Sequence, residues 1–443
     1  MTPRVLHRAE HTVSRKNIDA DALKVLYRLK NHGFNGYLVG GGVRDLLLAR
    51  KPKDFDIGTN AHPQQVKKLF RNCFIIGRRF RLCHVRFGRK VIEVSTFRKL
   101  AEAEEGDTLI RRDNTFGTPQ EDAFRRDFTV NALFYDIATF SVIDYVGGLA
   151  DLDAGIIRTI GDPGVRLRED PVRMIRAVAL AARLGFAIDR DTVEAIRALR
   201  GEIVKSSPPR IVDEFYKVLR QGASRKTLLM LHDLGLLAYL LPEADRAITE
   251  GGGALLASLG RLDEHRNAGL ASPEQLTNPI LMGSLFVPLE MPLRRGALPP
   301  RREAERADEP VDDVKAELLA LGEELPREPP ARLPSGPLIL PFARRDLDRM
   351  QLILVAQKRL REVTRSAHVK QLLASRGYFE DALRWMEIHG GDEGRDLVAH
   401  WRSLDLGDLP PPPSLLAQAP PAGAEGHSRR RRRRRRRRAP PEA

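Results

Sequence analysis

Two aspartates separated by one residue, Asp54 and Asp56, follow a run of three glycines at positions 40–42. If residues 54–57 form a strand, alternation places both carboxylates on one face of it. Two neighbouring carboxylates can hold two Mg²⁺ ions about 3.5–4 Å apart, which clamp the attacking and leaving oxygens of a displacement at phosphorus. The glycines let backbone N–H groups approach a ligand closely. Together these groups predict a site for a triphosphate and its metal ions.

The elements expected around these residues bring the glycines and the aspartates together. An apolar run ends at Val39, and a helix is expected to begin just after the glycines, near Val43. Its positive N-terminal end and the backbone of Gly41 and Gly42 then face a phosphate group. Arg44 is the expected charged partner of that phosphate. A glycine turn or an acidic turn is common when it occurs alone, so the prediction depends on their order and spacing.

A third carboxylate is predicted farther along the chain. Glu93 lies on a strand-like run and is the candidate third metal ligand. A mixture of helices and strands, with a sheet that bears the carboxylates, predicts a catalytic head with both kinds of element. Three strand-like runs follow a helix expected over residues 62–70, namely residues 74–76, 82–87 and 91–97.

The patterns G-G-x-x-R-D at 40–45 and D-x-D at 54–56 resemble the head of the tRNA nucleotidyltransferase/poly(A) polymerase family, the class II nucleotidyltransferases. The resemblance implies an α+β head with a polymerase β-like sheet, followed by an all-α neck, body and C-terminal region. The segment R-R-D-F-T-x-N-A at 125–132 matches a second family motif. In the family this segment recognises the ribose. We therefore expect Asp127 to bind the sugar hydroxyls, Arg126 to bind phosphate, and Asn131 to belong to the same nucleotide site.

A third family motif, E-D-x-x-R, begins at residue 169. Asp170 and Arg173 are three residues apart, so on one helix they can face the same way. An aspartate acceptor and an arginine donor fit the N6 donor and N1 acceptor of adenine without a template strand. Cytosine offers the same order of groups, so this pair does not separate ATP from CTP. Arg210, in a segment similar to the family's neck, is expected to support the base-reading helix.

The stretch G-R-R-F-R-L-C-H-V at 77–85 decides between two members of the family. It resembles the signature that marks bacterial poly(A) polymerases, whereas CCA-adding enzymes usually carry a T-G-x-x-H-G-T-like segment there. The resemblance implies addition of AMP from ATP to single-stranded RNA 3′ ends, with Asp54, Asp56 and Glu93 holding two Mg²⁺ ions. A CCA-adding tRNA nucleotidyltransferase remains the alternative. A catalytically inactive RNA-binding protein is the alternative from another class.

Composition agrees with an anionic partner, because the 443 residues carry a net charge of +15. Ten of the positive charges form an unbroken arginine run at 429–438, so the remainder is only mildly basic. Like charges repel, and this run is expected to be disordered.

The expected division of the chain runs from a flexible lead-in to a disordered tail. The ranges are a lead-in (1–17), a catalytic head (18–160), a helical neck that reads the base (161–245), a body with linkers or insertions (246–343), a helical C-terminal RNA-binding region (344–408) and a Pro- and Arg-rich tail (409–443).

The cellular setting is the last group of expectations. Two cysteines cannot build a disulfide framework, and no apolar run has the length of a membrane span, so we expect a cytoplasmic protein without disulfides. The resemblance implies that the protein is bacterial. We further expect a monomer, with RNA-decay proteins as additional partners.

Overall fold

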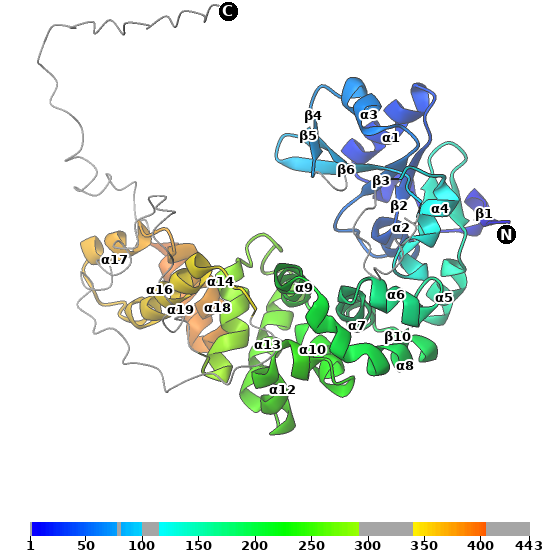
Figure 1. The fold of residues 1–443 in the computed structure, drawn as a ribbon. Helices are drawn as coiled ribbons and strands as arrows, with labels where there is room; N and C mark the ends of the chain where they lie inside the picture. Colours follow the sequence, from blue (N-terminus) through cyan, green and yellow to red (C-terminus); the bar gives the residue numbers. More distant parts are fainter. Residues whose placement is uncertain (1, 78–80, 100–114, 292–339, 405–443) are drawn as a thin grey trace, which may run out of the picture.

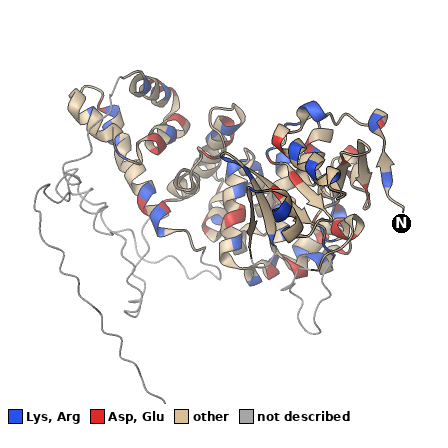
Figure 2. Cartoon of the chain, turned by 90° about the horizontal axis from the view of Figure 1, so that it is seen from above, with Lys and Arg blue, Asp and Glu red and all other residues tan. Residues whose placement is uncertain are grey.

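The computed structural model describes residues 2–77, 81–99, 115–291 and 340–404, and the structural statements below concern these ranges (Figure 1). Part of the signature stretch, residues 78–80, lies outside them, as do residues 100–114 and the whole 409–443 tail. No helix within the described ranges is long and apolar enough to cross a membrane. Basic and acidic side chains alternate over the head and neck instead of forming separate regions (Figure 2).

An eight-stranded mixed sheet forms the centre of the head, in the order β1-β8-β7-β2-β3-β6-β5-β4. All neighbouring strands are antiparallel except β3 and β6, which run parallel. The α+β head is therefore confirmed. The strands are β1 (Arg4–Leu6), β2 (Gly36–Val39), β3 (Asp56–Thr59), β4 (Cys73–Ile76), β5 (Leu82–Phe87), β6 (Lys90–Thr96), β7 (Leu133–Asp136) and β8 (Ser141–Asp144).

Helices α1 (Ala20–Asn31) and α3 (Pro63–Leu69) cover one face of this sheet (Figure 1). The carboxylate of Asp19 caps α1 by accepting the N–H groups of residues 21 and 22, at 2.9 and 3.3 Å. Alternation along β6 sends Ile92 and Val94 into the core under these helices. The same alternation leaves every second side chain of β6 on the opposite face of the sheet.

Four short elements complete the head, namely α2 (Gly41–Leu47), α4 (Pro119–Phe124), η3 (Thr129–Asn131) and α5 (Gly148–Ala154). Val43 of α2, Val130 of η3 and Leu149 of α5 join the main core. Ala123 of α4 instead packs in a small cluster with Phe97 and Phe134, separate from that core.

One expectation about the head is wrong. The lead-in is not a flexible segment throughout, because β1 pairs with β8 along its whole length, with Val5 opposite Ile143. The carboxylate of Asp144, at the end of β8, accepts N–H groups of residues 146–149 at 2.9–3.0 Å and so starts helix α5 directly after the strand.

Beyond the head the chain is helical, apart from a two-stranded parallel pair of β9 (Ile156–Ile157) and β10 (Ala187–Ile188). The helices form an arc that leads from the head to the C-terminal region (Figure 1). They are α6 (Pro163–Glu169), α7 (Val172–Leu184), α8 (Arg190–Leu199), α9 (Pro208–Arg220), α10 (Ser224–Asp233), α11 (Leu237–Leu240), α12 (Pro242–Thr249), α13 (Gly253–Asn267), α14 (Asn278–Phe286), α16 (Arg344–Arg361), α17 (Ala367–Ala374), α18 (Phe379–His389) and α19 (Gly391–Ser403), with 3₁₀ turns η1 (Arg8–Glu10), η2 (Arg15–Asn17), η4 (Arg200–Lys205) and η5 (Val287–Leu289).

Helix α7 is joined to the head at its C-terminal end. The guanidinium of Arg50, which follows α2, donates to the carbonyls of Arg183 and Leu184 at 3.3 Å each. Cations at this end of a helix also interact favourably with its dipole. The guanidinium of Arg183 in turn lies 3.9 Å from the carboxylate of Asp45 on α2. The last turn of α7 is thus attached to the helix that follows the glycine run.

Candidate active site

The glycine run connects β2 to α2 and determines how closely α2 approaches the acidic segment. Gly40 has φ +71° and ψ −136°, a conformation that residues with a side chain rarely adopt. A Cβ at Gly42 would lie 3.2 Å from the carbonyl oxygen of Asp54. These glycines therefore let the start of α2 lie directly against the segment that carries Asp54. The helix begins at Gly41, two residues earlier than expected.

Arg44 is buried, and its guanidinium is held by protein groups. Its Nε and Nη2 donate to Oδ1 of Asp45 at 2.8 and 2.6 Å, and its Nη1 donates to Oδ1 of Asn131. Through these bonds Arg44 joins the glycine turn to the second motif. Its expected contact with phosphate stays a prediction.

Asp56 and Glu93 lie side by side on the open face of the sheet. Asp56 is the first residue of β3, and the parallel register that pairs Ile57 with Val94 puts Glu93 beside it on β6. Both side chains are exposed. The expectation that Asp54 shares this strand is wrong, because β3 begins only at Asp56. Asp54 precedes the strand, and its Oδ2 lies 3.6 Å from Nζ of Lys53.

Negative charge is concentrated at Asp56. Partial shielding from water, together with repulsion from the carboxylates of Glu93 and Asp54, raises the pKa of Asp56 to about 6, although Arg126 acts in the opposite direction. Because the side chain also reaches solvent, water screens part of this effect. A carboxylate in this situation is stabilised by a nearby cation.

The described residues contain no group of three or more His, Cys, Asp or Glu side chains already arranged around a metal position. The chemistry of the donor set nevertheless suits a hard divalent cation, because Asp54, Asp56 and Glu93 supply carboxylate oxygens and their charges already repel one another. The assignment of these three residues as metal ligands remains a prediction.

The second motif forms a network of ion pairs next to the glycine turn. Arg126 donates through Nε and Nη2 to Oδ2 of Asp122 at 3.1 and 2.9 Å, and through Nη1 to the carbonyl of Asn131 at 3.2 Å. Burial alone would raise the pKa of Asp122, but the charges of Arg126 and Arg125 lower it. A Cβ at Gly40 would lie 3.0 Å from Nη1 of Arg126, so the glycine also makes room for this arginine.

Asp127 is buried and links the head to α7. Its Oδ1 accepts the N–H of Phe128 at 2.8 Å and Nδ2 of Asn131 at 3.3 Å, and its Oδ2 lies 2.5 Å from Nη2 of Arg176. Burial alone would raise the pKa of Asp127, but Arg176 and these hydrogen bonds lower it. Sequence reasoning gave Arg176 no role. The signal was present, because Arg176 follows Arg173 at the same three-residue spacing that separates Arg173 from Asp170.

The third motif lies at the junction of two helices, not on one helix as expected. Asp170 ends α6, and α7 begins at Val172. Oδ2 of Asp170 accepts from Nη2 of Arg210 at 2.9 Å, in agreement with the support expected from Arg210. Oδ1 of Asp170 is buried and has no hydrogen-bond partner among the described residues. Arg173 is buried too, and its Nη1 donates to the carbonyl of Arg166 at 2.7 Å and to Glu169 at 3.1 Å.

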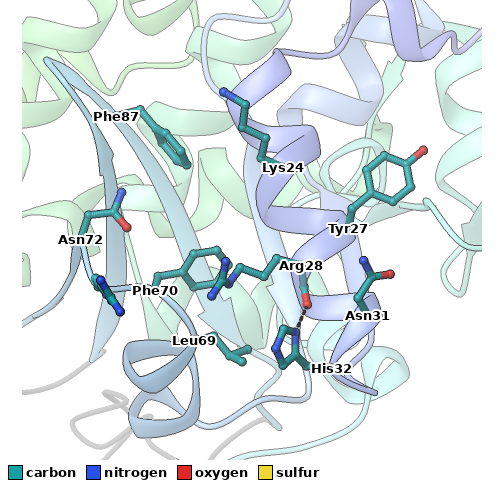
Figure 3. Close-up of a pocket in the computed structure, with 10 residues that line it drawn as sticks. Lys24, Tyr27, Arg28, Asn31, His32, Leu69, Phe70, Asn72 and Phe87 are labelled. Atoms are coloured by element: carbon teal, nitrogen blue, oxygen red, sulfur yellow. Dashed lines mark hydrogen bonds between the residues drawn. The ribbon is translucent and has the colours of Figure 1, made fainter.

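A cavity of about 730 Å³ lies on the helix-covered face of the head, away from these carboxylates (Figure 3). Lys24 and Arg28 of α1 border it, with Phe70 and Phe87 on the opposite wall. The guanidinium carbon of Arg28 is 5.6 Å from the centroid of the Phe70 ring. This arrangement is a cation stacked on an aromatic ring, and none of the three motifs contributes to it.

Comparison with known proteins agrees with this geometry. Residues 36–158 match the family described as "Poly A polymerase head domain", and residues 185–248 match "Probable RNA and SrmB- binding site of polymerase A". The head of this chain is thus similar to the head domain of poly(A) polymerases, and part of the helical region after it is similar to the RNA-binding segment described for them.

Individual relatives come from two branches of the family. The chain is 51% identical to poly(A) polymerase I of Salmonella typhi over 257 residues, which are 56% of this chain and 55% of that protein. It is 35% identical to the CCA-adding enzyme of Bacillus velezensis over 246 residues, 55% of this chain and 61% of that protein. The matched region thus spans little more than half the length of these relatives.

A solved structure extends the likeness over more of the chain. The CCA-adding enzyme of Bacillus stearothermophilus in complex with CTP superposes with a TM-score of 0.56 at 26% identity. The match covers 86% of this chain and 80% of that one. The likeness in fold therefore extends beyond the head into the helical part of the chain.

Proposed function

We propose that this protein is a template-independent polynucleotide adenylyltransferase that adds AMP from ATP to single-stranded RNA 3′ ends. One observation carries the proposal, namely that the fold brings Asp56, Glu93 and the Asp54 segment together beside the glycine turn. The higher identity to poly(A) polymerase I than to the CCA-adding enzyme supports RNA tailing over CCA addition.

The reaction joins the RNA 3′-oxygen to the α-phosphorus of ATP, breaks the bond from that phosphorus to the β-phosphate bridging oxygen, and releases pyrophosphate. Asp54, Asp56 and Glu93 would hold two Mg²⁺ ions, which when bound lower the pKa of the 3′-hydroxyl and neutralise the triphosphate. Arg126 stands next to Gly40 and would meet the triphosphate at the turn.

Binding of the nucleoside is assigned to the residues around α7. Asp127 would accept from a ribose hydroxyl while Arg176 keeps it ionised. The buried Oδ1 of Asp170 accepts no hydrogen bond from the described residues, and the N6 amino group of adenine can donate one to it. Arg173 would donate to N1 of adenine, exchanging its bond to Glu169 for one to the base.

CCA addition is the second candidate, because the structural likeness to the CTP-bound CCA-adding enzyme covers most of both chains. An inactive RNA-binding protein is the third, and the intact set of carboxylates argues against it. Free thiols at both cysteines fit the proposed bacterial cytoplasmic location.

The test supplies one labelled nucleoside triphosphate at a time, with Mg²⁺ and either a short RNA primer or a tRNA that lacks its 3′ end. We expect ATP to be used far better than CTP and the primer to grow well beyond three nucleotides. Addition of C, C and A to the tRNA followed by arrest would establish the CCA reaction instead. Absence of any transfer, with RNA binding intact, would favour the inactive protein.

A further inference from the structure

The open face of strands β4, β5 and β6 carries apolar side chains that the protein leaves exposed. Phe74 is 50% exposed, Ile76 47% and Val91 39%. Cys73, Val85 and Ile92 on these strands are buried in the core under α1 and α3, so alternation directs the exposed side chains to the opposite face. Exposed apolar side chains gathered on one face are typical of a binding surface.

This face leads directly to the predicted catalytic carboxylates. The register pairs Phe74 of β4 with His84 of β5, and His84 with Glu93 of β6. Nε2 of His84 lies 3.4 Å from Oε1 of Glu93, and Asp56 is the next residue across the sheet. At a strand spacing of about 4.8 Å, Phe74 is roughly 14 Å from Asp56 across the sheet.

A cation accompanies the exposed ring. The guanidinium carbon of Arg86, on β5, lies 5.0 Å from the centroid of the Phe74 ring. Arg86 is exposed and forms no ion pair among the described residues. An accessible ring beside an unneutralised arginine suits single-stranded nucleic acid, since a base can stack on the ring while a phosphate meets the cation.

The predicted nucleotide site lies on one side of the carboxylates, so the RNA has to approach them from the side of the β4–β6 face. Arg126, Asp127 and α7 lie on the glycine-turn side of Asp56 and are assigned to the incoming nucleotide. The 3′-hydroxyl must reach the same carboxylates from another side, and the exposed β6–β5–β4 face begins at Glu93.

We propose that the β4–β6 face binds the last nucleotides of the RNA substrate, with Phe74 stacking on a base and Arg86 contacting a backbone phosphate. His84, held by Glu93, lies between them and the reacting end. The inference rests on the proposed transfer to RNA. Stacking on phenylalanine tolerates every base, as a site requires when the RNA end changes during growth of a tail.

The chain provides a matched control on its other face. Arg28 is stacked on Phe70 beside the cavity of Figure 3, as Arg86 is stacked on Phe74, but the sheet lies between the Arg28 pair and the carboxylates on the open face. Arg28→Gln and Arg86→Gln therefore remove the same charge from opposite faces of the same domain.

The experiment measures binding of the full chain to a short oligoadenylate with 2-aminopurine as its penultimate base, without ATP. We expect Phe74→Leu to weaken binding by about 5- to 100-fold and to abolish quenching of the 2-aminopurine, whereas Phe74→Trp retains both. Arg86→Gln should reduce the slope of log affinity against log salt by about 0.7, and Arg28→Gln should leave it unchanged. The KM for ATP should stay the same in all four variants.

If Phe74→Leu binds the oligonucleotide with wild-type affinity and still quenches the 2-aminopurine, the proposal is overturned. A protein in which another segment of the chain covers this face would give that same result. Equal salt slopes for Arg28→Gln and Arg86→Gln would overturn the role of Arg86. Because binding is measured without nucleotide transfer, the outcomes separate the two proposals. If the protein transfers CMP but binds RNA through Phe74, only the proposal of adenylyl transfer is refuted. If the protein transfers AMP but Phe74→Leu binds RNA as tightly as the wild type, only the proposal of the RNA-binding face is refuted.

Discussion

Replacement of Asp56 by asparagine is expected to stabilise the metal-free protein while abolishing catalysis. The pKa of Asp56 is raised from 3.8 to about 6, so its ionised form is disfavoured in the folded state. At 1.36 kcal/mol per pKa unit the full shift corresponds to roughly 3 kcal/mol. Because the side chain reaches solvent, we reduce this to about 1 kcal/mol, or about 2–4 °C in the Tm of a domain the size of the head.

The sign of the effect follows from the direction of the shift. Below the unfolded pKa of 3.8 both states of the protein hold the proton, and Asp56 costs no stability. As the pH rises from there through the folded pKa of about 6, the unfolded state gives up its proton first, and the folded state loses stability relative to it. Asp56→Asn should therefore match the wild type near pH 4 and exceed it in Tm at pH 8.

Thermal unfolding at pH 4 and pH 8, with EDTA and with Mg²⁺, is the assay. Mg²⁺ should raise the Tm of the wild type at pH 8 and reduce its deficit relative to Asp56→Asn. Asp153→Asn, at an exposed position of α5, controls for the change in net charge and should have no such pH dependence. If the Asp56→Asn protein is no more stable than the wild type at pH 8, the reasoning that charge repulsion at this site destabilises ionised Asp56 is refuted.

Further predictions concern the ligands, the neck and the tail. Asp54→Ala and Glu93→Gln should each slow AMP transfer by several kcal/mol of barrier while RNA affinity persists, and near-normal rates in Mg²⁺ would contradict their assignment. Arg176→Met should raise the KM for ATP about tenfold or more, because it leaves Asp127 buried without its cation, and Arg176→Lys should recover part of the loss. Deletion of residues 428–443 should weaken RNA binding at low salt, with a single-strand salt slope reduced by about 0.7 per lost phosphate contact and kcat unchanged at saturating primer. Equal Kd values at low salt for the full and shortened chains would exclude a tether role for the arginine run.

Much of the head was predictable because its signals are local. The helix expected over residues 62–70 is confirmed as α3, which begins at Pro63. Alternation identified the three strands after α3, which the structure also confirms. Local pattern failed at Asp54, which was expected on the same strand as Asp56 but precedes that strand.

The sequence predicted which residues belong to the candidate site, but it did not predict which residues bind to them through hydrogen bonds and ion pairs. The motifs named Arg44, Asp127 and Asp170, yet their partners come from 1 to 87 residues away and depend on the tertiary fold. Arg176 was missed for this reason, since only the approach of α7 to the head pairs it with Asp127. Arg78, Arg79 and Phe80 of the discriminating stretch lie outside the described residues, so their part in the choice between ATP and CTP stays a prediction.

The two attachments of α7 to the head have a mechanical consequence. Near its start Arg176 is bound to Asp127, and at its end the carbonyls of Arg183 and Leu184 are bound by Arg50. A helix fixed at both ends cannot slide or tilt relative to the sheet without breaking an ion pair or these hydrogen bonds. These contacts oppose any change in the separation between the groups assigned to the base and the carboxylates. In the proposed repeated addition of nucleotides, the RNA strand, and not this helix, would then move by one nucleotide at each step.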